Sequence, residues 1–239
     1  MKNNTVYEWL LHSTFAVSER DGSLESAKPY LSAMFQPGDE ILDLCCGTGF
    51  LSFWFESNGA KVTGIDFAPY MISLAQKEAH QRSSDVKFIE ADILKQDFGE
   101  EQFCLISCFD SLSDFQSSDL VSLSRKIAKA LKPGGRFVIK YLDGIYTKIK
   151  GKDLLTEGKY QEEPELITFC FKEYLPEEGA FVNTIRNETR GEEYDRKGFI
   201  YTPPIVQLAM NLTLKLEQHI TLEQYQYLDV FTRRDQEPD

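Results

Sequence analysis

The sequence predicts an α/β protein built on a doubly wound, mostly parallel sheet. Two observations predict it. Short apolar runs alternate with longer helical patterns from residue 40 to residue 141, and two further strand patterns close the chain after a stretch in which polar and apolar residues alternate. Alternating strands and helices are typical of parallel sheets that carry helices on both faces.

The alternating region is expected to hold five strands and three helices. The expected strands are Glu40–Leu44, Lys61–Ile65, Val86–Glu90, Phe103–Phe109 and Arg136–Tyr141. The expected helices are Phe50–Ser57, Pro69–Arg82 and Ser118–Leu131. Pro69 suits the first turn of its helix. Apolar residues at helical spacing give that helix a broad apolar face: Met71, Ile72, Leu74, Ala75 and Ala79.

The segments on either side have a different texture. Residues 1–39 are predicted to form a helical cap over the mouth of the sheet, with an apolar side made of Trp9, Leu10, Leu11 and Phe15. Residues 142–200 predict an inserted antiparallel meander with strands at Leu166–Leu175, Ala180–Thr189 and Glu193–Ile200. Residues 201–239 predict a helix from Pro203 to about Asn211 and the last two core strands, Leu214–Ile220 and Tyr227–Phe231.

Composition limits the classes of protein and partner. A chain of 239 residues, 42% of them hydrophobic, suits one domain with a sizeable core. No run reaches the roughly 18 to 20 apolar residues of a membrane helix, and no export signal is recognised at the start, so we expect a cytoplasmic protein. The formal net charge is -12 and no basic stripe gathers the Lys and Arg residues, which disfavours nucleic acid and membrane surfaces as partners.

The stretch "ILDLCCGTGF" carries the main candidate binding turn. Gly47-Thr48-Gly49 follows a strand and opens a helix, so the backbone can approach a ligand closely and offers unpaired N–H groups. Asp66 ends the second strand, where an acid can hold a ribose diol. A dinucleotide site favours a third glycine, but Ser52 stands there. Asp43, just before the turn, suits a positively charged ligand, which points to a sulfonium cofactor.

Four pieces in order resemble class I S-adenosylmethionine-dependent methyltransferases, over about residues 38 to 141. They are "ILDLCCGTGFLSFWFESNGAKVTGIDFAPYMI", "VKFIEADILKQDF", "FCLISCFDSLSDF" and "LKPGGRFVI". The resemblance implies a Rossmann-like seven-stranded fold, S-adenosyl-L-methionine as cofactor and S-adenosyl-L-homocysteine as product. It also implies that the insert serves as a lid or an oligomer contact, in a monomer or a homodimer.

The resemblance assigns cofactor roles to individual residues. The first motif, which holds the methionine portion and the ribose, matches Asp43, Cys45, Gly47 and Gly49. Asp66 matches the acid that binds both ribose hydroxyls. The residues implied around the adenine are Phe67, Met71, Ala91, Asp92 and Ile93, with Asp92 bonded to the adenine amino group. Phe109 lies where the sulfonium would meet the substrate. Cys45 departs from the family, which usually has glycine at that position.

Other candidate residues carry less specific signals. The adjacent Cys45 and Cys46 lack the C-x-x-C spacing of a metal site and have no histidine near them in sequence, so no metal is expected. Five cysteines, an odd number, fit reduced thiols. The scattered histidines His12, His80 and His219 are expected to be structural or exposed. The segment "FDSLSDF" resembles small-molecule methyltransferases. Substrate-side candidates are Phe109, Asp110, Tyr141, Arg186 and Tyr201.

The sequence therefore predicts a methyltransferase that transfers a methyl group to nitrogen or oxygen of a small molecule by in-line displacement. Such a reaction needs alignment and a desolvated site, and it needs a general base only when the nucleophile arrives protonated. Two alternatives stay open at this point. One is methylation of a protein or peptide terminus by the same core, and the other is a non-catalytic Rossmann-like nucleotide-binding protein.

Overall fold

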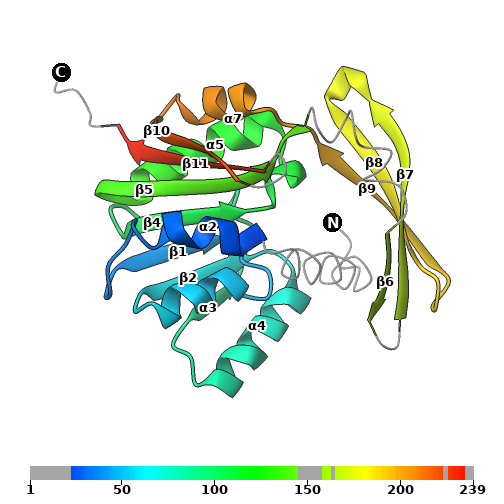
Figure 1. Cartoon of the computed structure of the whole chain (residues 1–239), viewed down its shortest axis with the longest axis horizontal. Helices are drawn as coiled ribbons and strands as arrows, with labels where there is room; N and C mark the ends of the chain where they lie inside the picture. Colours follow the sequence, from blue (N-terminus) through cyan, green and yellow to red (C-terminus); the bar gives the residue numbers. More distant parts are fainter. Residues whose placement is uncertain (1–22, 145–157, 163–164, 223–225, 235–239) are drawn as a thin grey trace.

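The computed structural model describes residues 23–144, 158–162, 165–222 and 226–234. Within these residues the chain forms two sheets (Figure 1). The first has seven strands in the order β10-β11-β5-β4-β1-β2-β3, and the second has four in the order β6-β7-β8-β9. The predicted apolar side of the N-terminal cap falls on residues 1–22, which lie outside the described residues.

The seven-stranded sheet is mostly parallel, as predicted. Its strands are β1 (Glu40–Leu44), β2 (Lys61–Asp66), β3 (Lys87–Glu90), β4 (Phe103–Phe109), β5 (Leu131–Leu142), β10 (Leu214–Thr221) and β11 (Gln226–Arg233). The first five pair in parallel, and β11 pairs antiparallel with both β5 and β10. The carboxyl ends of β1, β2 and β4 therefore meet at one edge, where ligands of such sheets bind.

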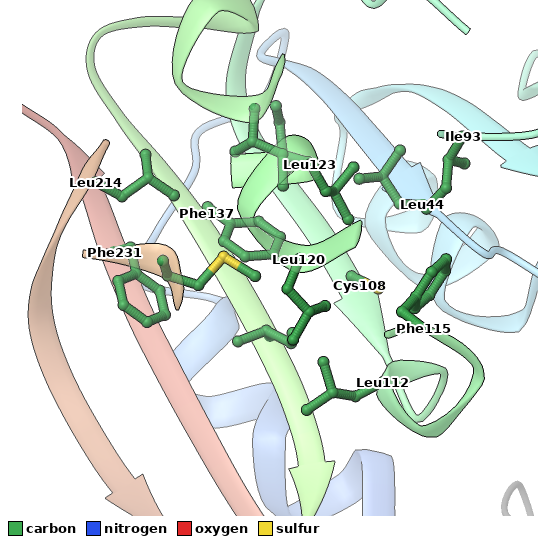
Figure 2. Close-up of a cluster of buried hydrophobic side chains, with 14 of the residues drawn as sticks. Leu44, Ile93, Cys108, Leu112, Phe115, Leu120, Leu123, Phe137, Leu214 and Phe231 are labelled. Carbon is green, nitrogen blue, oxygen red and sulfur yellow. The ribbon is translucent and has the colours of Figure 1, made fainter. Parts of the chain in front are cut away.

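Helices cover both faces of this sheet. They are α2 (Ser23–Leu31), α3 (Phe50–Ser57), α4 (Pro69–Arg82), α5 (Ser117–Ala130) and α7 (Pro203–Met210). Side chains of α5 and α7 pack with one face of the sheet in one apolar cluster, part of which Figure 2 shows around Phe137 and Leu120. Side chains of α2, α3 and α4 pack with the other face in a second cluster. Two buried faces explain why the central strands read as continuous apolar runs.

Local chemistry fixes where the helices begin. Gly49 is the residue before α3 and accepts the first helical hydrogen bond, from the Phe53 N–H at 2.8 Å. Pro69 occupies the first turn of α4, as predicted. A capping box starts α5, in which the Asp119 carboxylate accepts from the Gln116 N–H at 2.9 Å. The helices at Phe50–Ser57 and Pro69–Arg82 have the bounds predicted from the sequence.

The second sheet is an antiparallel meander of β6 (Gly158–Glu162), β7 (Glu165–Leu175), β8 (Ala180–Asn187) and β9 (Glu192–Phe199). Three of these strands were predicted; β6 was not. Strand β5 also begins earlier than predicted and takes in the turn around Gly134, which has a positive φ of 77°. Among the described residues, no helix is long and apolar enough to cross a membrane.

One contact joins the second sheet to the loop that follows β4, and two more hold Tyr201, just after β9, against the first sheet's loops. Arg196 of β9 forms an ion pair with Asp114 at 2.5 Å, in the short helix η1 (Leu112–Asp114). The Tyr201 hydroxyl donates to the Phe115 carbonyl at 2.6 Å, and the Gly144 N–H donates to the Tyr201 carbonyl at 2.7 Å. The meander therefore stands opposite the carboxyl edge of the first sheet (Figure 1).

Candidate active site

The glycine turn joins β1 to α3 with three residues in the left-handed region. Cys45, Gly47 and Gly49 have φ values of 56°, 54° and 85°. A Cβ on Gly49 would lie 2.4 Å from the Phe88 ring, whereas among the described residues nothing lies within 4 Å of a Cβ on Gly47. Gly49 is thus required by packing inside the protein. Gly47 borders open space, which is the space that a ligand lying against this loop needs.

Asp43 lies beneath the turn and is 2% exposed. Its carboxylate accepts hydrogen bonds from the Ser52 hydroxyl at 2.6 Å and the Ser107 hydroxyl at 2.8 Å. Burial raises its pKa to about 6, although both hydroxyls act in the opposite direction. Asp43 therefore ties β1 to α3 and β4. Because the carboxylate is buried, it can act on a ligand through its negative charge but not through a direct hydrogen bond.

Asp66, at the end of β2, closes the glycine turn from the other side. One carboxylate oxygen accepts from the Gly47 N–H at 2.9 Å and the other from the Ala68 N–H at 2.9 Å. Burial raises the pKa of this carboxyl, and the hydrogen bonds from Ala68 and Gly47 partly offset the shift. Asp66 thus sets the conformation of the turn. The backbone of Phe67 also bonds this carboxylate, which leaves about one of its four acceptor sites for a ligand hydroxyl.

The residues implied around the adenine differ in exposure. Phe67 is 42% exposed and presents an apolar ring at the end of β2, whereas Met71 and Ile93 are buried. The Ala91 N–H donates to the Asp66 carbonyl at 2.9 Å, which joins the ends of β2 and β3. Asp92 is partly exposed, and the Lys95 ammonium 2.9 Å away lowers its carboxyl pKa. Phe67 and Asp92 therefore reach the surface beside the glycine turn, and Met71 and Ile93 do not.

The carboxyl ends of β4 and β5 bring together Phe109, Asp110 and Lys140. Lys140 is 1% exposed, and its Nζ lies 2.6 and 2.7 Å from the two carboxylate oxygens of Asp110. The same ammonium lies 5.9 Å from the centre of the Phe109 ring. Asp110 has a φ of 56° and its N–H donates to the Lys140 carbonyl at 3.0 Å. The sequence predicted Phe109 and Asp110 here but missed Lys140.

Three predicted substrate-side residues lie away from this cluster. Tyr141 is buried, and its hydroxyl donates to Asp229 at 2.7 Å. Tyr201 is buried and bonded to Phe115 as described above. Arg186 pairs with Glu193 at 2.8 Å. Glu193 and Arg196 are three positions apart on β9, and side chains alternate between the two faces of a strand, so the Arg186–Glu193 pair lies on the face of the second sheet opposite to Arg196. We assign these three residues structural or surface roles and leave them out of the proposed site.

The residues that the sequence reasoning missed share one signal. Ser52, Ser107 and Lys140 are buried polar residues within apolar runs, and each is bonded to a buried or half-buried carboxylate. A polar residue in an otherwise apolar strand, such as Lys140 in "RFVIKYL", is the pattern that could have identified them. Ser52, which replaces the third glycine of a dinucleotide motif, is explained by its bond to Asp43.

The cysteines have packing roles in the described part of the chain. Cys46 packs beneath the turn, so that a Cβ on Gly64 would lie 2.9 Å from its sulfur. Cys45 packs against the apolar cluster that contains Cys108, and the neighbouring Cys108 thiol, together with burial, raises the pKa of Cys45. Cys45, Cys46, Cys104 and Cys108 are free thiols. Within the described ranges, no group of three or more His, Cys, Asp or Glu residues is arranged to hold a metal ion.

The fold and this turn are those of class I methyltransferases that use S-adenosylmethionine as cofactor. Comparison with known families agrees. Residues 41–135 match the family model described as "Methyltransferase domain". Residues 41–135 are therefore a methyltransferase domain of this class. The open space beside Gly47 and the exposed ring of Phe67 fit such a cofactor.

The curated relatives include methyltransferases that match this chain over part of their own length. Phosphoethanolamine N-methyltransferase 3 of Arabidopsis thaliana is 30% identical over 193 residues, which is 75% of this chain and 39% of that protein. Demethylmenaquinone methyltransferase of Thermus thermophilus is 36% identical over 101 residues, or 41% of this chain and 45% of the relative. The chain thus spans less than half the length of these two relatives.

Solved structures share the fold over almost the whole chain. The PH0226 protein from Pyrococcus horikoshii superposes with a TM-score of 0.75 at 24% identity, covering 90% of this chain and 92% of that one. The CcbJ methyltransferase from Streptomyces caelestis superposes with a TM-score of 0.71 at 18% identity, covering 88% and 89%. At these identities the likeness concerns the fold alone, and it extends beyond the residues of the family model.

Proposed function

We propose that this protein transfers a methyl group from S-adenosylmethionine to a nitrogen or oxygen atom of a small molecule. The observation that supports it most directly is the glycine turn. It has left-handed backbone at Gly47 and Gly49, open space beside Gly47, and the Asp66 carboxylate at its edge. Small-molecule acceptors are supported by the names of relatives, which include phosphoethanolamine N-methyltransferases and a ubiquinone biosynthesis O-methyltransferase.

In this proposal the cofactor lies across the carboxyl ends of β1, β2 and β4. The residues that would hold it are Asp43, Cys45, Gly47, Gly49, Asp66, Phe67, Met71, Ala91, Asp92, Ile93 and Phe109. The turn supplies backbone N–H groups at the start of α3. Asp66 and Asp92 supply carboxylate acceptors for hydroxyl and amino groups, and Phe67 supplies an apolar face.

When bound, S-adenosylmethionine supplies an electrophilic methyl group on a positively charged sulfur. The chain contributes alignment and the exclusion of water, since a sulfonium already carries a good leaving group. Asp43 provides a buried negative field under the turn. The second sheet would close the acceptor side as a lid, because Arg196 and Tyr201 hold it on the loop after β4.

Calorimetry with S-adenosylhomocysteine and with NAD separates this proposal from a dinucleotide-binding function. We expect the homocysteine product to bind and NAD to give no heat. A second assay follows release of S-adenosylhomocysteine from S-adenosylmethionine with phosphoethanolamine, glucosamine, catechol and a short peptide as acceptors. Turnover with the peptide alone would favour methylation of a peptide terminus. Tight binding of NAD without binding of S-adenosylhomocysteine would overturn the proposal.

Asp66→Ala tests the ribose position. Two hydrogen bonds to a charged acceptor contribute roughly 3 kcal/mol or more, so we expect the affinity for S-adenosylhomocysteine to fall about 100-fold. Asp85→Ala, at an exposed position after α4, is the matched control and should bind normally. Because Asp66 also holds Gly47, thermal unfolding of each variant is measured in parallel. A folded Asp66→Ala variant with near-normal affinity would show that the ribose lies elsewhere.

A further inference from the structure

The Lys140–Asp110 pair occupies an unusual position for two charges. Lys140 lies in β5 between Ile139 and Tyr141, both of which are buried, and is itself 1% exposed. An apolar residue at such a place is often at least as stabilising as an ion pair, because burying charges has a large desolvation cost. Packing alone therefore does not account for a lysine here.

The backbone of Asp110 is strained as well. Its φ of 56° lies in the left-handed region, which an L-residue other than glycine adopts at a cost of about 1–2 kcal/mol. Two contacts hold it there: the Asp110 N–H donates to the Lys140 carbonyl at 3.0 Å, and the Lys140 ammonium bonds both carboxylate oxygens. Lys140 thus fixes both the backbone and the side chain of Asp110.

The orientation of Asp110 leaves part of its carboxylate open. The side chain is 33% exposed, in contrast to the buried ammonium. A carboxylate has about four lone-pair sites, and Lys140 uses one on each oxygen. The remaining sites can accept hydrogen bonds from a group outside the protein. Because the ammonium balances the carboxylate charge, the pair offers hydrogen-bond acceptors without a net negative charge.

Strand register places this acceptor beside the glycine turn. Leu44, at the end of β1, is opposite Cys108 of β4. Asp110 comes two residues after Cys108, so it lies beside the start of the glycine turn, about one strand spacing (roughly 4.8 Å) away across the sheet. The Cys45–Cys108 thiol contact joins the two strands at this level. The second sheet reaches the same loop at Ser113 and Asp114 through Arg196.

We propose that Asp110 accepts a hydrogen bond from the nucleophilic group of the methyl acceptor, and that Lys140 is the residue that positions it. This inference rests on the proposed function. It narrows the acceptor to molecules whose nucleophile carries its own hydrogen, namely an amine or a hydroxyl group. The hydrogen bond turns the nucleophile's lone pair away from Asp110 and toward the transferable methyl group. As the C–N or C–O bond forms, the C–S bond breaks to leave S-adenosylhomocysteine, and the proton of the nucleophile passes to Asp110 and on to solvent. Thiolates have no such hydrogen and gain nothing from Asp110.

The experiment compares wild type with Asp110→Asn, Lys140→Met, Lys140→Arg and the double variant Asp110→Asn/Lys140→Met. Phosphoethanolamine, glucosamine and catechol are the N–H and O–H acceptors, and 2-mercaptoethanol, which reacts as its thiolate, is the sulfur acceptor. Kinetics give kcat and KM for each acceptor. Calorimetry gives the affinity for S-adenosylhomocysteine and the affinity of each acceptor for the protein saturated with S-adenosylhomocysteine. Arg136→Met is the matched control. Arg136 lies on the same strand as Lys140, and the substitution removes its exposed ion pair with Glu217 of β10.

For the best N–H or O–H acceptor, we expect Asp110→Asn to lower kcat/KM and acceptor affinity about 30-fold, the effect of losing a charged hydrogen-bond acceptor. The affinity for S-adenosylhomocysteine should change less than twofold, and transfer to the thiol should not fall. Lys140→Arg should retain more transfer than Lys140→Met. The double variant should unfold at or above the wild-type temperature and show the same loss, because it removes both charges together.

Unchanged kcat/KM in Asp110→Asn would overturn the inference. A loss of affinity for S-adenosylhomocysteine as large as the loss of kcat/KM would also overturn it, as would unfolding of both the single and the double variants. A wild-type protein that prefers the thiol over the N–H and O–H acceptors would overturn it too. Failure of the wild type to bind S-adenosylhomocysteine would instead overturn the proposed function. The two failures are therefore distinguishable.

Discussion

Cys45 shows how a single residue departs from a family pattern without disturbing it. Its φ of 56° is the conformation that favours glycine, and the family usually has glycine there. The cysteine is accommodated because its thiol contacts Cys108 at the same level of the neighbouring strand. The positive φ of Cys45 destabilises the folded protein, and the packing of its side chain stabilises it. We therefore expect residue 45 to accept small side chains and not β-branched ones.

Substitution at Cys45 tests this balance. We expect Cys45→Gly to change the free energy of unfolding by less than about 1 kcal/mol, because relief of backbone strain offsets the greater flexibility of glycine in the unfolded chain. Cys45→Val should destabilise by about 2 kcal/mol or more, since a β-branched residue is least compatible with positive φ. Urea unfolding measures both. Equal losses in the two variants would mean that residue 45 is not left-handed.

At the scale of elements, the last two strands, β10 and β11, are joined to β5 by a buried carboxylate. Asp229 is fully buried and accepts from the Tyr141 hydroxyl at 2.7 Å and the Gln207 amide at 3.3 Å, and His219 Nδ1 lies 2.5 Å from it. Register puts His219 about three strand spacings, roughly 14 Å, from Phe109. His219 therefore belongs to a cluster that stabilises this side of the sheet, and it lies three strands away from Phe109.

Tyr141→Phe tests that assignment. The change removes one donor from a buried carboxylate, so we expect the free energy of unfolding to fall by about 1–3 kcal/mol. The affinity for S-adenosylhomocysteine should stay within twofold of wild type. Tyr30→Phe, at an exposed position on α2, is the matched control and should change neither quantity. Loss of acceptor turnover at unchanged stability would instead return Tyr141 to the substrate site, as the sequence predicted.

At the scale of the whole molecule, Asp43 makes global stability depend on pH. Its folded-state pKa of about 6 lies above the value of 3.8 expected for an exposed aspartate. Between these values the folded protein binds more protons than the unfolded chain, so this group's contribution to stability falls as pH rises from about 4 to 6 and is constant above. The full shift corresponds to about 3 kcal/mol.

Asp43→Asn isolates this contribution from the other carboxyl groups, including Asp66, whose pKa is also raised by burial. We expect the stability of the variant relative to wild type to improve by about 2–3 kcal/mol as pH rises from 4 to 7. Denaturant unfolding at several pH values measures the difference. A difference that does not depend on pH would show that the Asp43 carboxyl titrates normally in the folded protein.

Most elements of the first sheet were predictable because each carries a local signal. The strand at Phe103–Phe109 and the helices after Gly49 and Pro69 have the predicted bounds. Strand β6 was not predictable, since "GKYQE" has no apolar run and gains its pairing only from β7. The early start of β5 was missed because Pro133 and Gly134 usually interrupt strands.

The candidate site divides in the same way. The sequence by itself determined the class of protein, the cofactor and the residues of the glycine turn, because their spacing along one short stretch carries the chemistry. Only the tertiary structure decided that Ser52 and Ser107 hold Asp43, that Lys140 holds Asp110, and that Tyr141 and Arg186 face away from the site. Those facts depend on which strands are neighbours and which way each side chain points, and such long-range pairing leaves little trace in local sequence.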